Sequence, residues 1–190
     1  MPRPIMKLLA IYNFGMFRRP TDDPVNEGFH RRNDLNFLIA ERSDGFVARS
    51  GYDGEPGPES WGKQVYPRFY DDRGDGWAPS TLSLWQDLPS LMAFTYAGIH
   101  REAMRHAPDW FVERSWPGYV LFWVEAAQRP IWADGVVARL EMLHEKESGP
   151  EAFDFKFPYD AGGNRTTVNN EEVRCKMDLN MAVRSRLDLE

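Results

Sequence analysis

The sequence contains one cysteine, Cys175, so no disulfide can form within a single chain. This cysteine usage is typical of a reducing compartment and predicts a cytoplasmic protein. No block of Lys and Arg stands out, and the formal net charge is −6. We therefore expect neither nucleic acid nor an anionic membrane as a partner. No apolar run approaches the length of a membrane span.

Motifs for several common chemistries are also missing. The four histidines show no close ligand spacing, and no Cys-x-x-Cys or His-Glu-x-x-His pattern occurs. No glycine-rich phosphate loop follows a strand, and there is no serine nucleophile elbow. We therefore expect no metal site and no organic cofactor.

Aromatic side chains, by contrast, are abundant: 7 Trp, 7 Tyr and 12 Phe in 190 residues. Such rings usually fill cores, pockets or subunit interfaces. Hydrophobic residues make up 42 % of the chain, which suffices for one domain with a substantial core. The segment 51–79 is crowded with Gly, Pro and Asp yet carries several rings. We expect it to pack onto the domain, either at the mouth of a site or as a surface excursion.

Hydrophobic periodicity predicts an α+β protein with two β-α-β halves, followed by a further helix and strand. Strands are expected at 7–17, 45–50, 81–85, 118–125 and 152–157, and helices at 25–42, from Asp87 to about Ala107, and at 132–146. This order indicates a ferredoxin-like βαββαβ protomer with an extra C-terminal helix and strand. The domain would span 1–158 with the loop 51–79 inserted, and 159–190 would form a polar tail or an arm over a neighbouring subunit.

Successive side chains of the first strand are expected to point to opposite faces of the sheet, which divides them into two sets. Leu8, Ala10, Tyr12 and Phe14 form one set, and Leu9, Ile11 and Asn13 the other. The face without helices needs a cover. Because little chain is left over, a second copy of the protein is the expected one.

Four stretches carry a resemblance to a known family. They are LAIYNF…RRPTDDP with Gly28–Phe29, SDGFVAR at 43–49, residues 82–111, and residues 119–157. Over roughly 8–157 the chain resembles a family named only as a domain of unknown function, number 3291, within the dimeric α+β barrel superfamily. The resemblance implies a homodimer in which two sheets close a barrel, each protomer keeping a cavity between its sheet and its helices. Members of the superfamily catalyse diverse reactions or only bind, so the fold does not decide the function.

The sequence departs from the family pattern at three positions. Phe37 stands where relatives often carry Asn, Ala48 where they often carry Trp, and Gln128 where they often carry His. These departures imply a specialised or lost activity.

His100 is the leading candidate for chemistry. On the expected helix it shares a stripe with Tyr96 and points at the sheet, whereas His106 faces solvent. An imidazole in an apolar cavity can serve as an acid or a base near neutral pH. The alternative is a core histidine bonded to a backbone carbonyl or to Tyr96.

Asn13 and Tyr96 complete the candidate catalytic group as donors to an oxyanion. For Asn13 the alternative is a hydrogen bond that joins the strand to a helix. The candidate substrate-binding residues are Tyr12, Trp85, Phe37, Phe122, Trp123 and Arg101. The rings would mould an apolar pocket or simply fill the core, and Arg101 would serve as an anion clamp or lie on a solvated face.

The leading hypothesis is therefore a small homodimeric enzyme of specialised metabolism that acts on a hydrophobic small molecule. Its chemistry would be cofactor-free acid/base catalysis: isomerisation, cyclisation, or oxygenation of a phenol or enol. One alternative is a haem-binding enzyme with His100 as the axial ligand. The other is a non-catalytic module for small-ligand binding or dimerisation.

Overall fold

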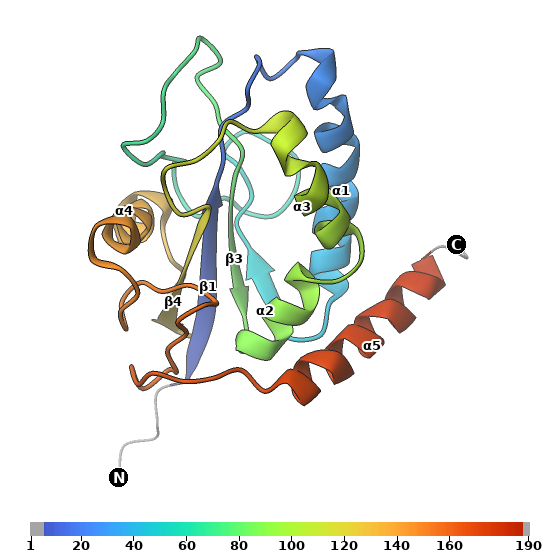
Figure 1. Ribbon diagram of the computed structural model, residues 1–190, viewed down its shortest axis with the longest axis vertical. Coiled ribbons are helices and arrows are strands. Elements are labelled where there is room, and N and C mark those ends of the chain that lie inside the picture. The colour runs from blue at the N-terminus through green and yellow to red at the C-terminus, as the bar shows by residue number, and fades with distance from the viewer. Residues whose placement is uncertain (1–5, 188–190) are drawn as a thin grey trace.

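A computed structural model describes residues 6–187 and has a four-stranded antiparallel sheet at its centre (Figure 1). The strands are β1 (Lys7–Phe14), β2 (Phe46–Arg49), β3 (Ser80–Trp85) and β4 (Tyr119–Glu125). They lie in the order β2-β3-β1-β4. The first strands of the two β-α-β halves are therefore central, as the expected βαββαβ order requires. The mixed α+β architecture is confirmed.

Helices α1 (Glu27–Arg42) and α2 (Leu88–Thr95) cover one face of this sheet, and α3 (Gly98–Trp110) packs against both. The 3-10 turn η1 (Pro24–Asn26) leads into α1. Asp87 begins α2 as expected, since its carboxylate accepts a hydrogen bond from the backbone N–H of Ser90 at 2.8 Å. The core on this face contains Leu9, Ile11, Ala40, Trp85, Leu88, Leu91, Leu121 and Phe153.

The expectation of one helix from Asp87 to about Ala107 is wrong. Helix α2 ends at Thr95, and α3 begins at Gly98. Gly98 has φ +52°, a left-handed conformation that glycine adopts readily and that turns the chain. Helix α3 then continues past Ala107, through Pro108, to Trp110. Because of the turn, Tyr96 and His100 do not share a stripe on one helix.

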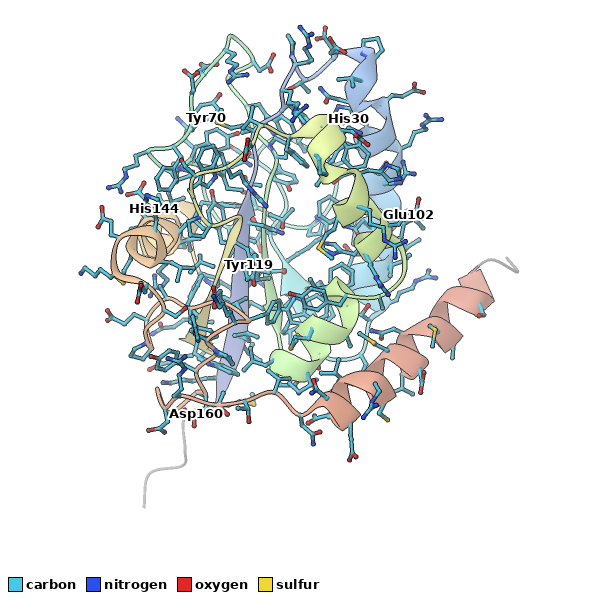
Figure 2. The ribbon with its side chains drawn as sticks, viewed as in Figure 1. His30, Tyr70, Glu102, Tyr119, His144 and Asp160 are labelled. Atoms are coloured by element: carbon cyan, nitrogen blue, oxygen red, sulfur yellow. The ribbon has the colours of Figure 1, made fainter. Side chains whose placement is uncertain are left out.

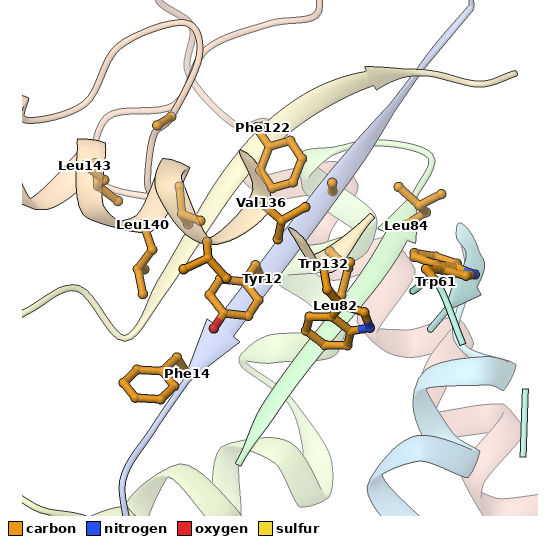
Figure 3. Close-up of a cluster of buried hydrophobic side chains, with 14 of the residues drawn as sticks. Tyr12, Phe14, Trp61, Leu82, Leu84, Phe122, Trp132, Val136, Leu140 and Leu143 are labelled. Carbon is orange, nitrogen blue, oxygen red and sulfur yellow. The ribbon is translucent and has the colours of Figure 1, made fainter. Parts of the chain in front are cut away.

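The opposite face of the sheet is covered by α4 (Val137–Lys146) and by the π-helical turn η2 (Trp132–Val136) that precedes it. Figure 3 shows Trp132, Val136 and Leu140 above the strand residues of this cluster. Rings of the loop 51–79 pack against the same cluster: Tyr52, Trp61, Tyr66, Phe69 and Tyr70. The chain thus covers this face itself, and the reason for expecting a second copy there does not hold.

The segment 152–157 forms no strand. Phe153 exchanges two backbone hydrogen bonds with Leu121, and then the chain bends away. The bend follows from Asp154, whose carboxylate accepts the backbone N–H of Phe157 at 2.9 Å.

The C-terminal segment contains α5 (Asn170–Leu187), which packs along α2 (Figure 1). Lys176 Nζ lies 2.5 Å from a carboxylate oxygen of Asp44, and the backbone N–H of Asp44 donates to Asn180 Oδ1 at 2.9 Å. The described part of the expected loose tail is therefore a helix docked on its own chain. Within residues 6–187, no helix is long and apolar enough to cross a membrane.

Candidate functional site

The side chains that the sequence suggests for a site lie on both faces of the sheet. Tyr12 and Phe122 belong to the cluster under α4. Trp85 and Trp123 pack in the cluster on the face that α1 and α2 cover. Because the sheet separates these two pairs, they cannot line one cavity. The single apolar pocket that these rings were expected to line is therefore not formed.

His100 is half-buried near the start of α3. Its Nδ1 donates to the backbone oxygen of Thr95 at 2.9 Å, and its ring centroid lies 4.9 Å from that of Phe94. Burial lowers the pKa of the imidazole, although the bond to Thr95 opposes this shift. The geometry is that of a neutral histidine tied to a backbone carbonyl, which is the bonding that the alternative to a catalytic role describes.

The other proposed catalytic groups have separate surroundings. Asn13 accepts a hydrogen bond from the hydroxyl of Thr81, its partner across β1 and β3, so its amide joins strand to strand rather than strand to helix. Tyr96 is 38 % exposed, and its ring lies 5.7 Å from that of Phe155. Arg101 is exposed on α3.

A pocket of about 320 Å³ lies where the edge strand β2 meets the loop 51–79. Its lining consists of Glu41 from α1, Phe46, Ala48 and Arg49 from β2, Pro58, Glu59 and Trp61 from the loop, and Arg129. We call it the β2 pocket. None of the proposed catalytic or substrate-binding residues lines it. Phe37 contacts one lining residue, because the Arg49 guanidinium carbon lies 4.1 Å from the centre of its ring.

Local structure explains how the loop reaches this pocket. The backbone N–H of Gly51 donates to Glu59 O at 3.0 Å. A Cβ at Gly51 would lie 1.8 Å from the backbone oxygen of Pro58, so only glycine allows this close approach. The loop therefore leaves β2 at Gly51 and folds back against the same point. This brings Pro58 and Glu59 to the edge of the sheet.

The hydroxyl of Ser50 fixes the floor of the pocket. It accepts hydrogen bonds from the backbone N–H of Trp61 and from Trp132 Nε1, both at 2.9 Å, and donates to Gly51 O at 2.7 Å. Trp61 is 5 % exposed and belongs to the core under α4 (Figure 3). The apolar floor of the β2 pocket is thus continuous with the core of the domain.

Two arginines in the lining differ in how firmly they are placed. Arg49 Nε lies 2.7 Å from Glu41 Oε1, and the Arg49 side chain is only 15 % exposed. Arg129 lies 2.6 Å from Glu59 Oε2, but these two side chains are 63 % and 78 % exposed. An exposed pair of this kind contributes about 0–1 kcal/mol. The first pair is part of the fold, and the second can open.

A second pocket, of about 20 Å³, lies between the loop 51–79 and the segment after β1, and Tyr70 and Asp75 are part of its lining. Its volume suits a single water molecule. Tyr70 lies on the side of the sheet that carries α4 and His144, as Figure 2 shows. Burial and the nearby Asp72 carboxylate raise the pKa of Tyr70 to about 12, so its phenol stays protonated at neutral pH.

The β2 pocket could not be predicted from the sequence, because its residues lie on a helix, a strand and a loop within 41–61 and on the distant Arg129, with no common local pattern. Two sequence signals did point to it. One is the set of rings in the loop 51–79, whose Trp61 forms the floor. The other is the set of departures from the family pattern: Ala48 lines the pocket, Phe37 lies under Arg49, and Gln128 precedes Arg129.

Comparison with known proteins places the chain in a family. A family model described as a domain of unknown function (DUF3291) matches residues 8–169. Searches of curated proteins and of solved structures found no match. The matched region contains the sheet except Lys7, helices α1 to α4 and every residue of the β2 pocket. The chain belongs to this family of unknown function.

Proposed function

We propose that the protein binds a small amphipathic molecule in the β2 pocket, without an organic cofactor. The observation that carries this proposal is the pocket itself, with a volume of about 320 Å³ and a floor formed by Trp61. Ligand pockets typically measure about 300–1,000 Å³ and combine apolar walls with a few polar groups. Phe46, Ala48 and Pro58 supply such walls, and the arginine pairs supply the polar groups.

Binding fits this lining better than catalysis does. The residues that line the pocket include no histidine, cysteine, serine or tyrosine. Its two carboxylates, Glu41 and Glu59, are each paired with an arginine. The groups of the lining that could act as a base or a nucleophile are therefore carboxylates that already bond an arginine.

The acid/base enzyme and the haem enzyme, both centred on His100, stay predictions. Neither of the two pockets described above includes His100, and the Phe94 ring packs 4.9 Å from its imidazole. A porphyrin would need an open slot on the Nε2 side of that ring. The Phe94 ring packed on the imidazole argues against haem at His100, and we propose no haem there.

The homodimer expected from the resemblance needs an interface other than the sheet face that was expected to lack helices. In a dimeric α+β barrel the two sheets face each other. Here α4 and the loop 51–79 occupy the face that contains Tyr12. We propose that any second copy packs outside this cover. Sedimentation equilibrium of the full chain measures the association, and a hydrogen-exchange footprint centred on the Tyr12 face would contradict the proposed arrangement.

The binding function is tested by nuclear magnetic resonance of the ¹⁵N-labelled full chain. Three probes share a phenylbutyl body: 4-phenylbutan-1-ol, 4-phenylbutyramide and 4-phenylbutyrate. We expect at least one to cause saturable shifts in the backbone amides of Ala48, Arg49 and Trp61. Saturable shifts confined to other parts of the protein, or no saturable shift with any of the three at millimolar concentration, would overturn the proposal.

A further inference from the structure

The two arginines of the β2 pocket are not equivalent partners for a ligand. Arg49 is held on three sides: its Nε contacts Glu41, its guanidinium lies over the Phe37 ring at 4.1 Å, and an Nη atom lies 3.5 Å from Ser50 O. A cation fixed in this way over an aromatic ring belongs to the wall of the pocket. A ligand cannot draw it away without breaking the contacts of β2 with α1.

Arg129 has a single partner within residues 6–187, the Glu59 carboxylate at 2.6 Å. A guanidinium carries five N–H donors in a planar fork that matches a carboxylate. Most of the donors of Arg129 are therefore unused by the protein groups that the structure describes. Its side chain is 63 % exposed at the rim of the pocket, where a ligand can reach it.

Glu59 has a fixed backbone and an exposed side chain. Its carbonyl oxygen accepts the N–H of Gly51 at 3.0 Å, whereas its carboxylate is 78 % exposed. The carboxylate can swing into solvent without moving the loop. An exposed ion pair is worth about 0–1 kcal/mol, so little opposes its opening.

We infer that the β2 pocket selects hydrophobic carboxylates, and that Glu59 is an internal substitute which the ligand's carboxylate displaces from Arg129. The inference rests on the proposed binding function and adds the chemical class of the ligand. The apolar body of the ligand lies over Trp61, between Phe46 and Pro58, and its carboxylate takes the place of the Glu59 carboxylate on Arg129.

Among anionic ligands, one with a single negative charge disturbs the charge balance of the pocket least. The lining contains two arginines and two glutamates, so it has no net charge. A monocarboxylate that replaces Glu59 keeps Arg129 paired one to one. A phosphate dianion would add a second negative charge close to the carboxylates of Glu41 and the displaced Glu59. Repulsion between these like charges makes its binding less favourable. Fatty and aryl-substituted acids fit this requirement, and nucleotides do not.

The test compares the affinities of 4-phenylbutyrate and its uncharged analogue 4-phenylbutyramide by calorimetry at neutral pH. Wild-type protein is measured beside Glu59→Gln and Arg129→Gln. Glu145→Gln is the matched control, because Glu145 also forms an exposed pair, with Arg68 on the side of α4, and its loss changes the net charge equally.

We expect the wild type to prefer the acid over the amide. Glu59→Gln removes the competing carboxylate and should tighten acid binding about fivefold, the equivalent of one exposed ion pair. Arg129→Gln should abolish the preference for the acid by weakening acid binding, whereas Glu145→Gln, outside the pocket, should leave the affinities of both probes unchanged. Equal wild-type affinity for acid and amide, or a preference that survives in Arg129→Gln, would overturn the inference. Failure of both molecules to bind would instead overturn the proposed function.

Discussion

The hydroxyl oxygen of Ser50 lies 2.9 Å from the indole nitrogen of Trp132, a residue 82 positions later in the chain. The same oxygen accepts the backbone N–H of Trp61 at 2.9 Å. Ser50 is 3 % exposed, and Trp132 is fully buried. One hydroxyl therefore joins the end of β2, the loop 51–79 and the turn before α4, and it sets the position of the floor of the β2 pocket.

Replacing Ser50 with Ala should destabilise the protein by about 1–3 kcal/mol, because two buried donors lose their acceptor. Urea unfolding followed by circular dichroism measures the change. Ser185→Ala, which removes an exposed hydroxyl on α5, is the control and should change little. A Ser50→Ala variant as stable as the control would show that the hydroxyl does not join these segments.

The half-buried imidazole of His100 predicts a pH dependence of stability. Burial lowers its pKa in the folded protein below the ordinary value of 6.5. The unfolded chain then binds more protons than the folded one, so stability falls as the pH drops below about 6.5. His100→Asn keeps a donor for Thr95 O but cannot titrate. We expect its loss of stability between about pH 7 and about pH 5 to be smaller than that of the wild type.

This difference is measured by denaturant unfolding at each pH. Each unit by which the folded pKa is lowered corresponds to about 1.4 kcal/mol. His106→Asn, a change at an exposed histidine of the same helix, is the control and should follow the wild type. Parallel curves for wild type and His100→Asn would mean that the imidazole is not desolvated by folding.

Lys176 anchors α5. Its ammonium contacts Asp44 at 2.5 Å and lies 3.9 Å from Asp87, and its side chain is 14 % exposed. Lys176→Met should loosen α5 and speed amide hydrogen exchange in this helix about fivefold, the effect of losing roughly 1 kcal/mol of local stability. Arg174→Met, at an exposed position two residues earlier, should leave exchange unchanged. Similar exchange in both variants would contradict the anchoring role.

The sheet and most helices could be predicted from the sequence because their patterns are local. The alternation around Tyr12 predicts both faces of β1, and Asp87 marks the start of α2. The break between α2 and α3 was missed, because a glycine inside an apolar stripe, here Gly98, is compatible with either one helix or two. Helix α5 was missed because it is mostly polar, and its docking depends on Lys176 meeting Asp44 across 132 positions.

The candidate site could not be predicted for a related reason. Its arginines, Arg49 and Arg129, are 80 positions apart and have no shared local pattern. His100 is the leading candidate in the sequence because an imidazole can act as an acid or a base near neutral pH. In the structure its ring instead donates to the backbone oxygen of Thr95, five residues earlier. The position of a residue on a stripe predicts which way it points, but not whether a pocket lies in front of it.

Filling the β2 pocket tests the central claim most directly. Ala48 lines the pocket, whereas the neighbouring Val47 lies at the β-bulge, outside the lining, and is 41 % exposed. The measurement is the dissociation constant of 4-phenylbutyrate, by calorimetry, for wild type, Ala48→Trp and Val47→Trp. Ala48→Leu is a smaller filler in case the indole disturbs folding, which circular dichroism checks. We predict that fillers at Ala48 weaken binding at least tenfold and that Val47→Trp binds as the wild type does. Unchanged binding in folded variants with a filled pocket would contradict the account.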